Sequence, residues 1–142
     1  MKRIFNGKYK ITQTYHDRHK GLDVVGLSDK NVRSPIDGVV RSSTLITDHG
    51  NLTWEWGNYV RVDDADGNKL YFCHLAARFV KVGQKVKVGD PLGIMGNTGK
   101  SFGAHCHFEV RTQANIHKNP ADYLGVPNEK TTYEWIKTKS GW

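Results

Sequence analysis

The sequence predicts an all-β protein, and three features of the chain support this fold class. Short runs rich in β-branched and aromatic side chains recur throughout, each bounded by turn residues. The 15 glycines in 142 residues suit a protein with many tight turns. No segment keeps an apolar period of 3.6 residues over ten residues, as an amphipathic helix would. We therefore expect an all-β fold in a single domain.

The predicted strands alternate with turns from one end of the chain to the other. An Asp66-Gly67 pair between two of these strands is a strong hairpin signal. The tetrapeptide VKVG begins at Val80 and again at Val86, and we interpret it as two small strands joined by tight turns. The nearest candidates for helical structure are residues 119–124 and the tail at 131–139. The predicted strands are residues 10–15, 22–25, 38–47, 58–64, 69–75, 78–82, 84–88, 91–95 and 105–111.

The chain is basic, with a formal net charge of +7 and an isoelectric point near 9.5. Its Lys and Arg residues are spread along the sequence, without the aromatic-interleaved basic motif of a nucleic-acid binder. An acidic cell envelope is a polyanion that accounts for this charge equally well. No apolar stretch approaches the length needed to span a membrane, and the first residues lack the apolar run of a secretory signal. We expect no nucleic-acid partner and no membrane insertion.

Residues 103–112, GAHCHFEVRT, contain two histidines one residue apart within an alternating strand pattern. Alternate side chains of a strand point to opposite faces, so His105 and His107 share the polar face while Cys106 and Phe108 point to the core. Two positions along a strand separate the histidines by about 6.5 to 7 Å. Such a pair can converge on one small ligand, and it can equally be two solvated imidazoles on a surface strand.

A second histidine-rich segment, HDRHKGLDVV at residues 16–25, carries His19 and Asp23. Gly21 argues against a stable helix, so both side chains would lie on a turn leading into a strand, where they can face one ion. His74 closes a strand that is apolar on both faces, as either a hydrogen-bonded core residue or a site residue. Catalytic zinc takes three protein ligands and keeps a fourth position for water, which makes these residues and the histidine pair candidate ligands.

Three fragments in this order resemble a known family: HKGLD at 19–23, YFCHL at 71–75 and GKSFGAHCHFEVR at 99–111. They are similar to the lysostaphin/LytM-type (M23 family) zinc endopeptidases, which cut bacterial peptidoglycan. SPIDGVV, the VKVGQKVKVGDPLGIMGNTG segment and NPADYL resemble further parts of that family. The resemblance covers residues 11–124, so we treat residues 1–142 as one domain with a C-terminal extension at 125–142.

The resemblance implies roles for five residues on these motifs. His19, Asp23 and His107 would bind Zn²⁺, while His105 and His74 would stand beside the metal as catalytic residues. A metal-bound water would attack the peptide carbonyl with histidine assistance, since zinc lowers the pKa of its water toward ~7. The implied fold is a compact antiparallel β-sheet of barrel or sandwich type, with a narrow loop-walled groove over the zinc site.

The chain departs from the family pattern at a few positions. TQTYHDR lacks the common Gly-x-Arg before the first ligand, which leaves Tyr15 as the candidate for binding the substrate near the oxyanion. We expect Cys73 and Cys106 to be buried free thiols on the face opposite the histidines rather than a disulfide. His49 and His117 match no site residue of the family and are interpreted as surface residues. The tail tryptophans, Trp135 and Trp142, either cap the core or line the substrate groove.

The partner implied by the resemblance is the peptide part of peptidoglycan, bound by a monomer acting on the bacterial cell wall. Because no secretory signal opens the chain, we expect delivery by a phage or excision from a larger protein. One alternative is a catalytically inactive envelope-binding module of the same fold. Another is a carrier domain or sugar phosphocarrier, because VKVGDPLG also resembles their turns, although carriers lack the HKGLD ligand pair. The sequence leaves open which peptidoglycan bond is cut.

Overall fold

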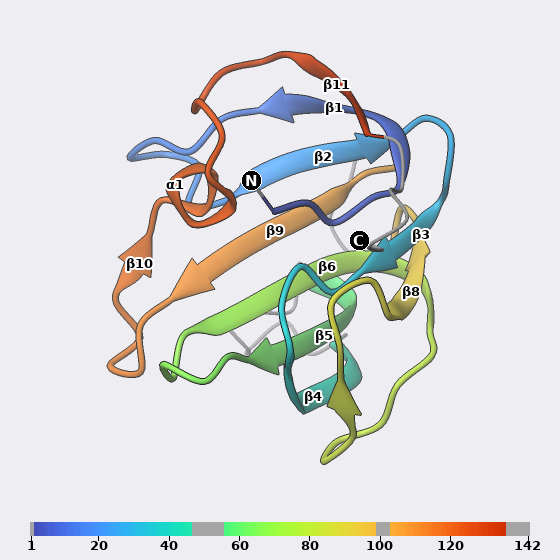
Figure 1. Cartoon of the computed structure of the whole chain (residues 1–142), viewed down its shortest axis with the longest axis vertical. Coiled ribbons are helices and arrows are strands. Elements are labelled where there is room, and N and C mark those ends of the chain that lie inside the picture. The colour runs from blue at the N-terminus through green and yellow to red at the C-terminus, as the bar shows by residue number, and fades with distance from the viewer. Residues whose placement is uncertain (1, 47–55, 99–102, 136–142) are drawn as a thin grey trace.

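The computed structural model describes residues 2–46, 56–98 and 103–135 (Figure 1). Its strands pair antiparallel in the order β11-β1-β2-β9-β6-β5-β4-β7, while β10 pairs with β9, and β8 pairs with both β3 and β6. The elements are β1 Gly7–Gln13, β2 Leu22–Gly26, β3 Asn31–Arg33, β4 Gly38–Ile46, β5 Gly57–Asp63, β6 Lys69–Arg78, β7 Lys85–Val86, β8 Pro91–Met95, β9 Cys106–Arg111, β10 His117–Lys118, α1 Pro120–Leu124 and β11 Thr132–Trp135.

The predicted all-β class is confirmed, and the sheet is open rather than closed into a barrel. The hairpin predicted at Asp66-Gly67 joins β5 to β6, and Gly67 takes the left-handed conformation there, with φ 81°. The candidate helical segment at 119–124 contains α1, where the Asn119 side chain accepts a hydrogen bond from the Ala121 N–H.

One predicted strand is wrong, and one candidate helical segment forms a strand instead. Residues 78–82 do not form a separate strand, because β6 runs on to Arg78 and the chain then turns. In the tail 131–139, residues 132–135 form β11 instead of a helix, and the rest of the segment lies outside the described residues. β11 pairs with β1, and the Tyr133 ring lies 5.5 Å from that of Tyr9, so pairing with an available strand outweighs a weak local helical preference.

The hydrophobic core lies on one face of the sheet. Phe72 of β6 and Phe108 of β9 are fully buried there, with ring centroids 5.1 Å apart. The N-terminal segment and the β3–β8 pair cover this face (Figure 1), and they contribute Phe5, Val32 and Leu92 to the core. Because successive residues of a strand alternate, this packing fixes which side chains of β6 and β9 point the other way.

The opposite face of β6 and β9 carries polar and aromatic side chains. Cys73 pairs directly with His107 across the two strands, and it packs in a separate small cluster with Tyr71 and Trp56. Our placement of both thiols opposite the histidines is therefore wrong for Cys73 and right for Cys106, which lies in the core. Both cysteines are buried and free, as expected.

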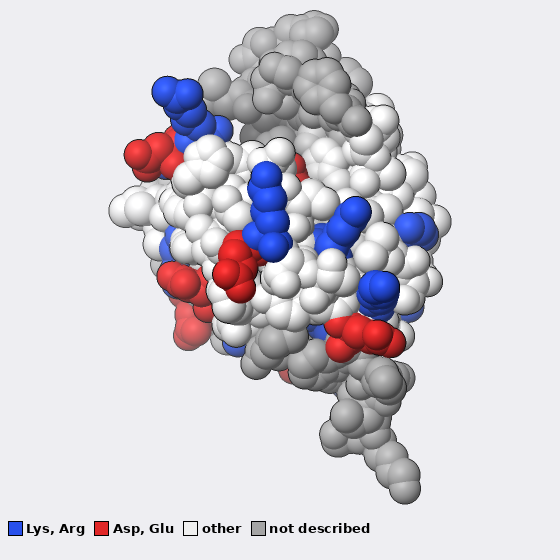
Figure 2. Space-filling model, turned by 90° about the horizontal axis from the view of Figure 1, so that it is seen from above, with Lys and Arg blue, Asp and Glu red and all other residues white. Residues whose placement is uncertain are grey.

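The surface shows how the net charge is distributed. Figure 2 shows one face on which Lys and Arg side chains are scattered and several lie close to Asp or Glu. On the described part of that face, the basic side chains do not merge into one continuous patch. Within residues 2–46, 56–98 and 103–135, no helix has the length and apolar character needed to cross a bilayer.

Candidate metal centre

Strand pairing brings two of the predicted ligands together. Asp23 of β2 and His107 of β9 are direct cross-strand partners, and their side chains lie on the same face of the sheet. The Nδ1 of His107 lies 2.8 Å from Oδ1 of Asp23. Residues that are 84 positions apart in the sequence thus meet through the register of one antiparallel pair.

A tight turn before β2 supplies the third predicted ligand. Reciprocal backbone hydrogen bonds of 2.9 and 3.0 Å join His16 and His19 and close this turn. The Nδ1–H of His19 donates to the Thr14 carbonyl at 2.9 Å, because a carbonyl can only accept. Its other nitrogen, Nε2, lies 3.3 Å from Oδ1 of Asp23. The turn therefore holds His19 with Nε2 directed at the aspartate.

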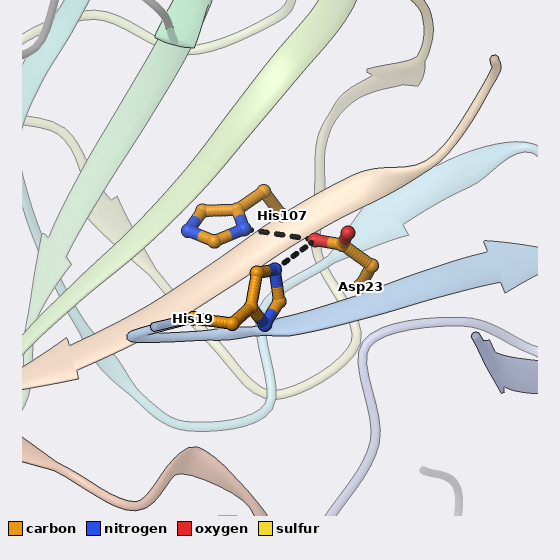
Figure 3. A group of neighbouring side chains, drawn as sticks. All are labelled: His19, Asp23 and His107. Carbon is orange, nitrogen blue, oxygen red and sulfur yellow. Dashed lines mark hydrogen bonds and ion pairs between the residues drawn. The ribbon is translucent and has the colours of Figure 1, made fainter. Parts of the chain in front are cut away.

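His19, Asp23 and His107 point toward one another (Figure 3), and their candidate ligand atoms all lie within 4.8 Å of each other. Two imidazoles and a carboxylate that leave a fourth position open form a donor set suited to catalytic zinc. In each imidazole the nitrogen that points away from Asp23, the outer nitrogen, has a hydrogen-bond acceptor. Nδ1 of His19 faces the Thr14 carbonyl, and Nε2 of His107 faces the Glu109 carboxylate. Acceptors of this kind orient metal-binding imidazoles. The three residues thus fit a zinc ion.

The charges of the cluster follow from its packing. Burial raises the pKa of the Asp23 carboxyl, but hydrogen bonds from His107 and His19 outweigh it and hold that pKa well below its usual range. Burial lowers the pKa of His107, yet its hydrogen bonds to Asp23 and Glu109 raise it on balance to about 9. A hydrogen bond to Asp23 also raises the pKa of His19. An ionised carboxylate therefore faces two imidazoles whose protons a cation can replace.

Gly21 provides the space in which the His107 ring lies. A Cβ atom at position 21 would stand 2.7 Å from Cε1 of His107 and 2.7 Å from the Phe108 carbonyl oxygen. Contacts that short require one group to move, so a side chain at Gly21 would displace the ring or the backbone of β9. The glycine of the HKGLD motif is thus explained by close packing against a predicted ligand.

The two predicted catalytic histidines lie beside this cluster. Their rings, His74 and His105, have centroids 4.9 Å apart, and Nε2 of His105 lies 3.6 Å from Oδ1 of Asp23. In each ring Nδ1–H donates to a backbone carbonyl, that of Thr98 for His74 at 2.7 Å and that of Gly103 for His105 at 2.8 Å. In the neutral rings, Nε2 is therefore the nitrogen that carries the lone pair.

An unusual backbone conformation turns His74 toward the site. Regular alternation would send its side chain to the core face together with Phe72, but His74 has a φ of 66°. The β5–β6 register shifts at this point, so that two residues of β6 stand opposite one of β5. Left-handed backbone at a non-glycine residue is strained and often marks a functional site. Burial lowers the pKa of His74 to about 4, so its ring is neutral at pH 7.

The other residues singled out from the sequence contact residues outside the three-residue cluster or are not among the described residues. The backbone of Tyr15 exchanges two hydrogen bonds with the Asn128 side chain, at 2.9 and 2.8 Å, and its ring lies under Nζ of Lys20. His117, expected at the surface, is partly buried, with Nε2 3.4 Å from Oε2 of Glu109. His49 and Trp142 are not among the described residues.

Glu109 was not singled out from the sequence, although it lies on the face of the sheet that carries His105 and His107, which we call the site face. It is buried, and its Oε1 lies 3.0 Å from Nε2 of His107. The alternation that placed His105 and His107 on one face also places Glu109 there, so the signal was present in the strand pattern. Its contact with the ligand ring depends on rotamers that the pattern does not specify.

The chain is thus an antiparallel β-sheet protein that carries a His₂Asp cluster with the spacing of metal ligands. Residues 17–120 match peptidase family M23, and the chain belongs to this family. The match confirms the family predicted from the HKGLD, YFCHL and HCHFEVR motifs and removes the carrier-domain alternative.

Two relatives illustrate the sequence similarity. Peptidoglycan DD-endopeptidase ShyC of Vibrio cholerae is 34% identical over 102 residues, which make up 72% of this chain and 22% of that protein. Glycyl-glycine endopeptidase ALE-1 of Staphylococcus capitis is 31% identical over 110 residues, with 75% of this chain and 29% of that protein covered. The chain thus spans less than a third of the length of either relative.

Solved structures agree with the sequence comparison. The antimicrobial peptidase lysostaphin from Staphylococcus simulans superimposes with a TM-score of 0.70 at 25% identity, covering 82% of this chain and 49% of that chain. A zinc containing peptidase from Vibrio cholerae gives a TM-score of 0.62 at 26% identity, covering 83% of this chain and 39% of that chain. Both superpositions cover more than four fifths of this chain.

Proposed function

We propose that this protein is a zinc-dependent endopeptidase that hydrolyses peptide bonds of bacterial peptidoglycan. The observation that carries the proposal is the convergence of two groups of side chains on one face of the sheet. His19, Asp23 and His107 form a cluster with the spacing of metal ligands, and the rings of His74 and His105 lie against it. Membership in peptidase family M23 supports hydrolysis as the chemistry.

His19 through Nε2, Asp23 through Oδ1 and His107 through Nδ1 would hold the zinc ion, because these are the atoms that face one another. When bound, zinc lowers the pKa of a coordinated water toward ~7 and supplies a nucleophile at neutral pH. The chain keeps each imidazole in one orientation through its outer nitrogen. Asp23 supplies the negative charge that balances part of the charge of the cation.

His105 and His74 would accept the proton that the attacking water loses and would pass it to the leaving amine. Each holds its Nδ1–H on a backbone carbonyl and so offers Nε2 as a proton acceptor toward the site. A ring that has taken the proton carries a positive charge and an N–H at Nε2. It can then stabilise the oxyanion on the attacked carbonyl and return the proton to the leaving amine.

The substrate class follows from the relatives. ShyC is named a peptidoglycan DD-endopeptidase and ALE-1 a glycyl-glycine endopeptidase, and the chain is similar to both. We propose that this protein likewise acts on the cell wall, as a monomer that binds the peptide part of the polymer. These relatives cleave different bonds, so the specific bond is left to experiment.

The inactive envelope-binding module is the second candidate function. The presence of all five predicted site residues in one place favours the enzyme, because a binding module has no need of a metal-ligand set beside two oriented imidazoles. Tyr15 is retained as a candidate substrate contact at the entrance of the His19 turn.

The proposal is tested by digesting purified walls of different cross-link chemistry with the zinc-loaded protein. Mass spectrometry of the released fragments should identify new amino termini at one class of peptide bond. The His107→Ala variant should release none above background. Binding to walls by both proteins without new termini from either would support the inactive module instead.

A further inference from the structure

We infer that Glu109 is a positioning residue for the metal centre: its carboxylate holds the His107 ring so that Nδ1 faces the ion. The inference rests on the proposed zinc site, and it assigns a role to a residue that is not itself a predicted ligand. Glu109 lies two positions beyond His107 on β9, on the same face of the strand.

Each ring nitrogen of His107 faces a carboxylate. Nδ1 faces Asp23 at 2.8 Å, and Nε2 faces Oε1 of Glu109 at 3.0 Å. A metal ion that binds Nδ1 needs the lone pair of that nitrogen, so the one hydrogen of the neutral ring must reside on Nε2. A carboxylate can only accept, so Glu109 accepts the hydrogen at Nε2 and stabilises the tautomer whose Nδ1 is available once a metal ion replaces the proton shared with Asp23.

Arg111 holds the Glu109 carboxylate in place. Nε and Nη2 of Arg111 donate to Oε2 of Glu109 at 3.2 and 3.0 Å, which leaves Oε1 directed at the His107 ring. The Arg111 guanidinium lies over the rings of Trp56 and Tyr71, with its carbon 5.3 and 5.0 Å from their centroids. Stacked between aromatic rings and a carboxylate, this guanidinium has little freedom to move.

The Glu109 carboxylate is buried, whereas its partner Arg111 is partly exposed. The carboxylate that contacts Nε2 of His107 therefore has little access to water. A buried carboxylate is costly unless it is paired and hydrogen-bonded, and both oxygens of Glu109 meet that requirement. The ring, the carboxylate and the guanidinium thus form a continuous chain from the metal centre to the aromatic cluster.

A purely structural ion pair is the competing interpretation. In that case, removing the carboxylate would lower thermal stability and leave the zinc affinity of the folded protein unchanged. Asp64 in the β5–β6 turn provides a control, because its carboxylate accepts hydrogen bonds from Asn68 and from Tyr123 of α1, neither of which belongs to the cluster.

The test measures zinc affinity of the full chain, after metal removal, by competition with a chromogenic chelator and without any substrate. Glu109→Gln keeps the shape of the side chain but loses its charge and can present an N–H to the ring. We expect the zinc dissociation constant of this variant to rise about 10- to 100-fold, the usual effect of losing such a partner. Glu109→Asp should recover part of the loss, and Asp64→Asn should bind zinc as the wild type does.

Nitrogen NMR of the zinc-loaded protein provides a second measurement. The wild-type His107 ring should carry its hydrogen on Nε2, with Nδ1 bound to the metal. Unchanged zinc affinity in a folded Glu109→Gln variant would overturn the inference, as would a wild-type His107 protonated on Nδ1. The zinc-affinity measurement involves no substrate, so its result is independent of the wall digestion. If zinc affinity depended on Glu109 but the protein released no wall fragments, only the proposed function would be overturned.

Discussion

The two faces of the β6–β9 pair are built from neighbouring residues but obey different rules. On one face, the buried rings of Phe72 and Phe108 pack together in the hydrophobic core. On the other face, His107 and Glu109 lie in a chain of directed hydrogen bonds that ends at Asp23 and Arg111. One step along the strand separates the two environments.

This difference separates stability from chemistry. Apolar packing is non-directional and tolerates changes of shape at a modest cost. Hydrogen bonds to a ligand ring are directional, and a small change of angle alters what the ring can bind. Substitutions on the core face should therefore change the free energy of unfolding, while substitutions on the site face should change metal binding and rate.

The largest effect is expected from removing a ligand on the site face. His107→Ala or Asp23→Ala leaves two protein donors, so zinc content and wall hydrolysis should fall together to background. Elemental analysis and a wall-lysis assay on the same preparation measure both quantities. A His107→Ala protein that retained one zinc per chain would break the comparison, because the roles assigned to His105 and His107 would then have to be exchanged.

A smaller effect is expected from His105→Ala and His74→Ala, which remove proton carriers but no ligand. Zinc should remain bound, while hydrolysis falls on the order of 10²- to 10⁴-fold, the usual worth of a positioned acid or base. The two losses need not add, since both rings would act on one proton transfer. If His74→Ala only lowered the melting temperature, with activity per folded molecule intact, His74 would belong to the core instead.

The two cysteines provide a matched pair with still smaller effects, since they lie on opposite faces of adjacent strands. Cys106→Ala should destabilise the protein by about 1 kcal/mol and leave zinc affinity unchanged. Cys73→Ala should cost a similar amount and also weaken zinc binding several-fold, because Cys73 packs directly across from His107. Denaturant unfolding and chelator competition separate these outcomes, and equal zinc affinities in both variants would contradict the contrast between the faces.

A separate effect is expected in the pH dependence of stability. Burial, with the neighbouring His105 and His107 rings, lowers the folded-state pKa of His74 to about 4, against the opposing influence of the Thr98 carbonyl and Asp23. The unfolded state binds the proton near the ordinary value of ~6.5, so this residue contributes a loss of stability as the pH falls from about 6.5 to 4. In metal-free protein, His74→Gln should reduce this pH dependence. An identical slope in both proteins would show that the ring is not shielded from solvent.

The strand pattern was sufficient to predict the fold class, the hairpin at Asp66-Gly67 and the shared face of His105 and His107. The direction of His74 could not be predicted, because it depends on a left-handed φ of 66° at a register shift. The face of Cys73 was misjudged for a related reason, since it follows from the β6–β9 register rather than from the sequence of β6 alone. Local patterns specify alternation, whereas partners and rotamers are specified by tertiary packing.

The central claim is that the three-residue cluster on the site face makes hydrolysis depend on zinc. The most direct measurement is the rate at which new amino groups appear from purified walls as zinc is added to metal-free protein. The rate should be at background without metal and should rise to a plateau at one zinc per chain. Undiminished hydrolysis by the metal-free protein would contradict the account. So would a protein that binds walls but does not hydrolyse them at any ratio of zinc to protein.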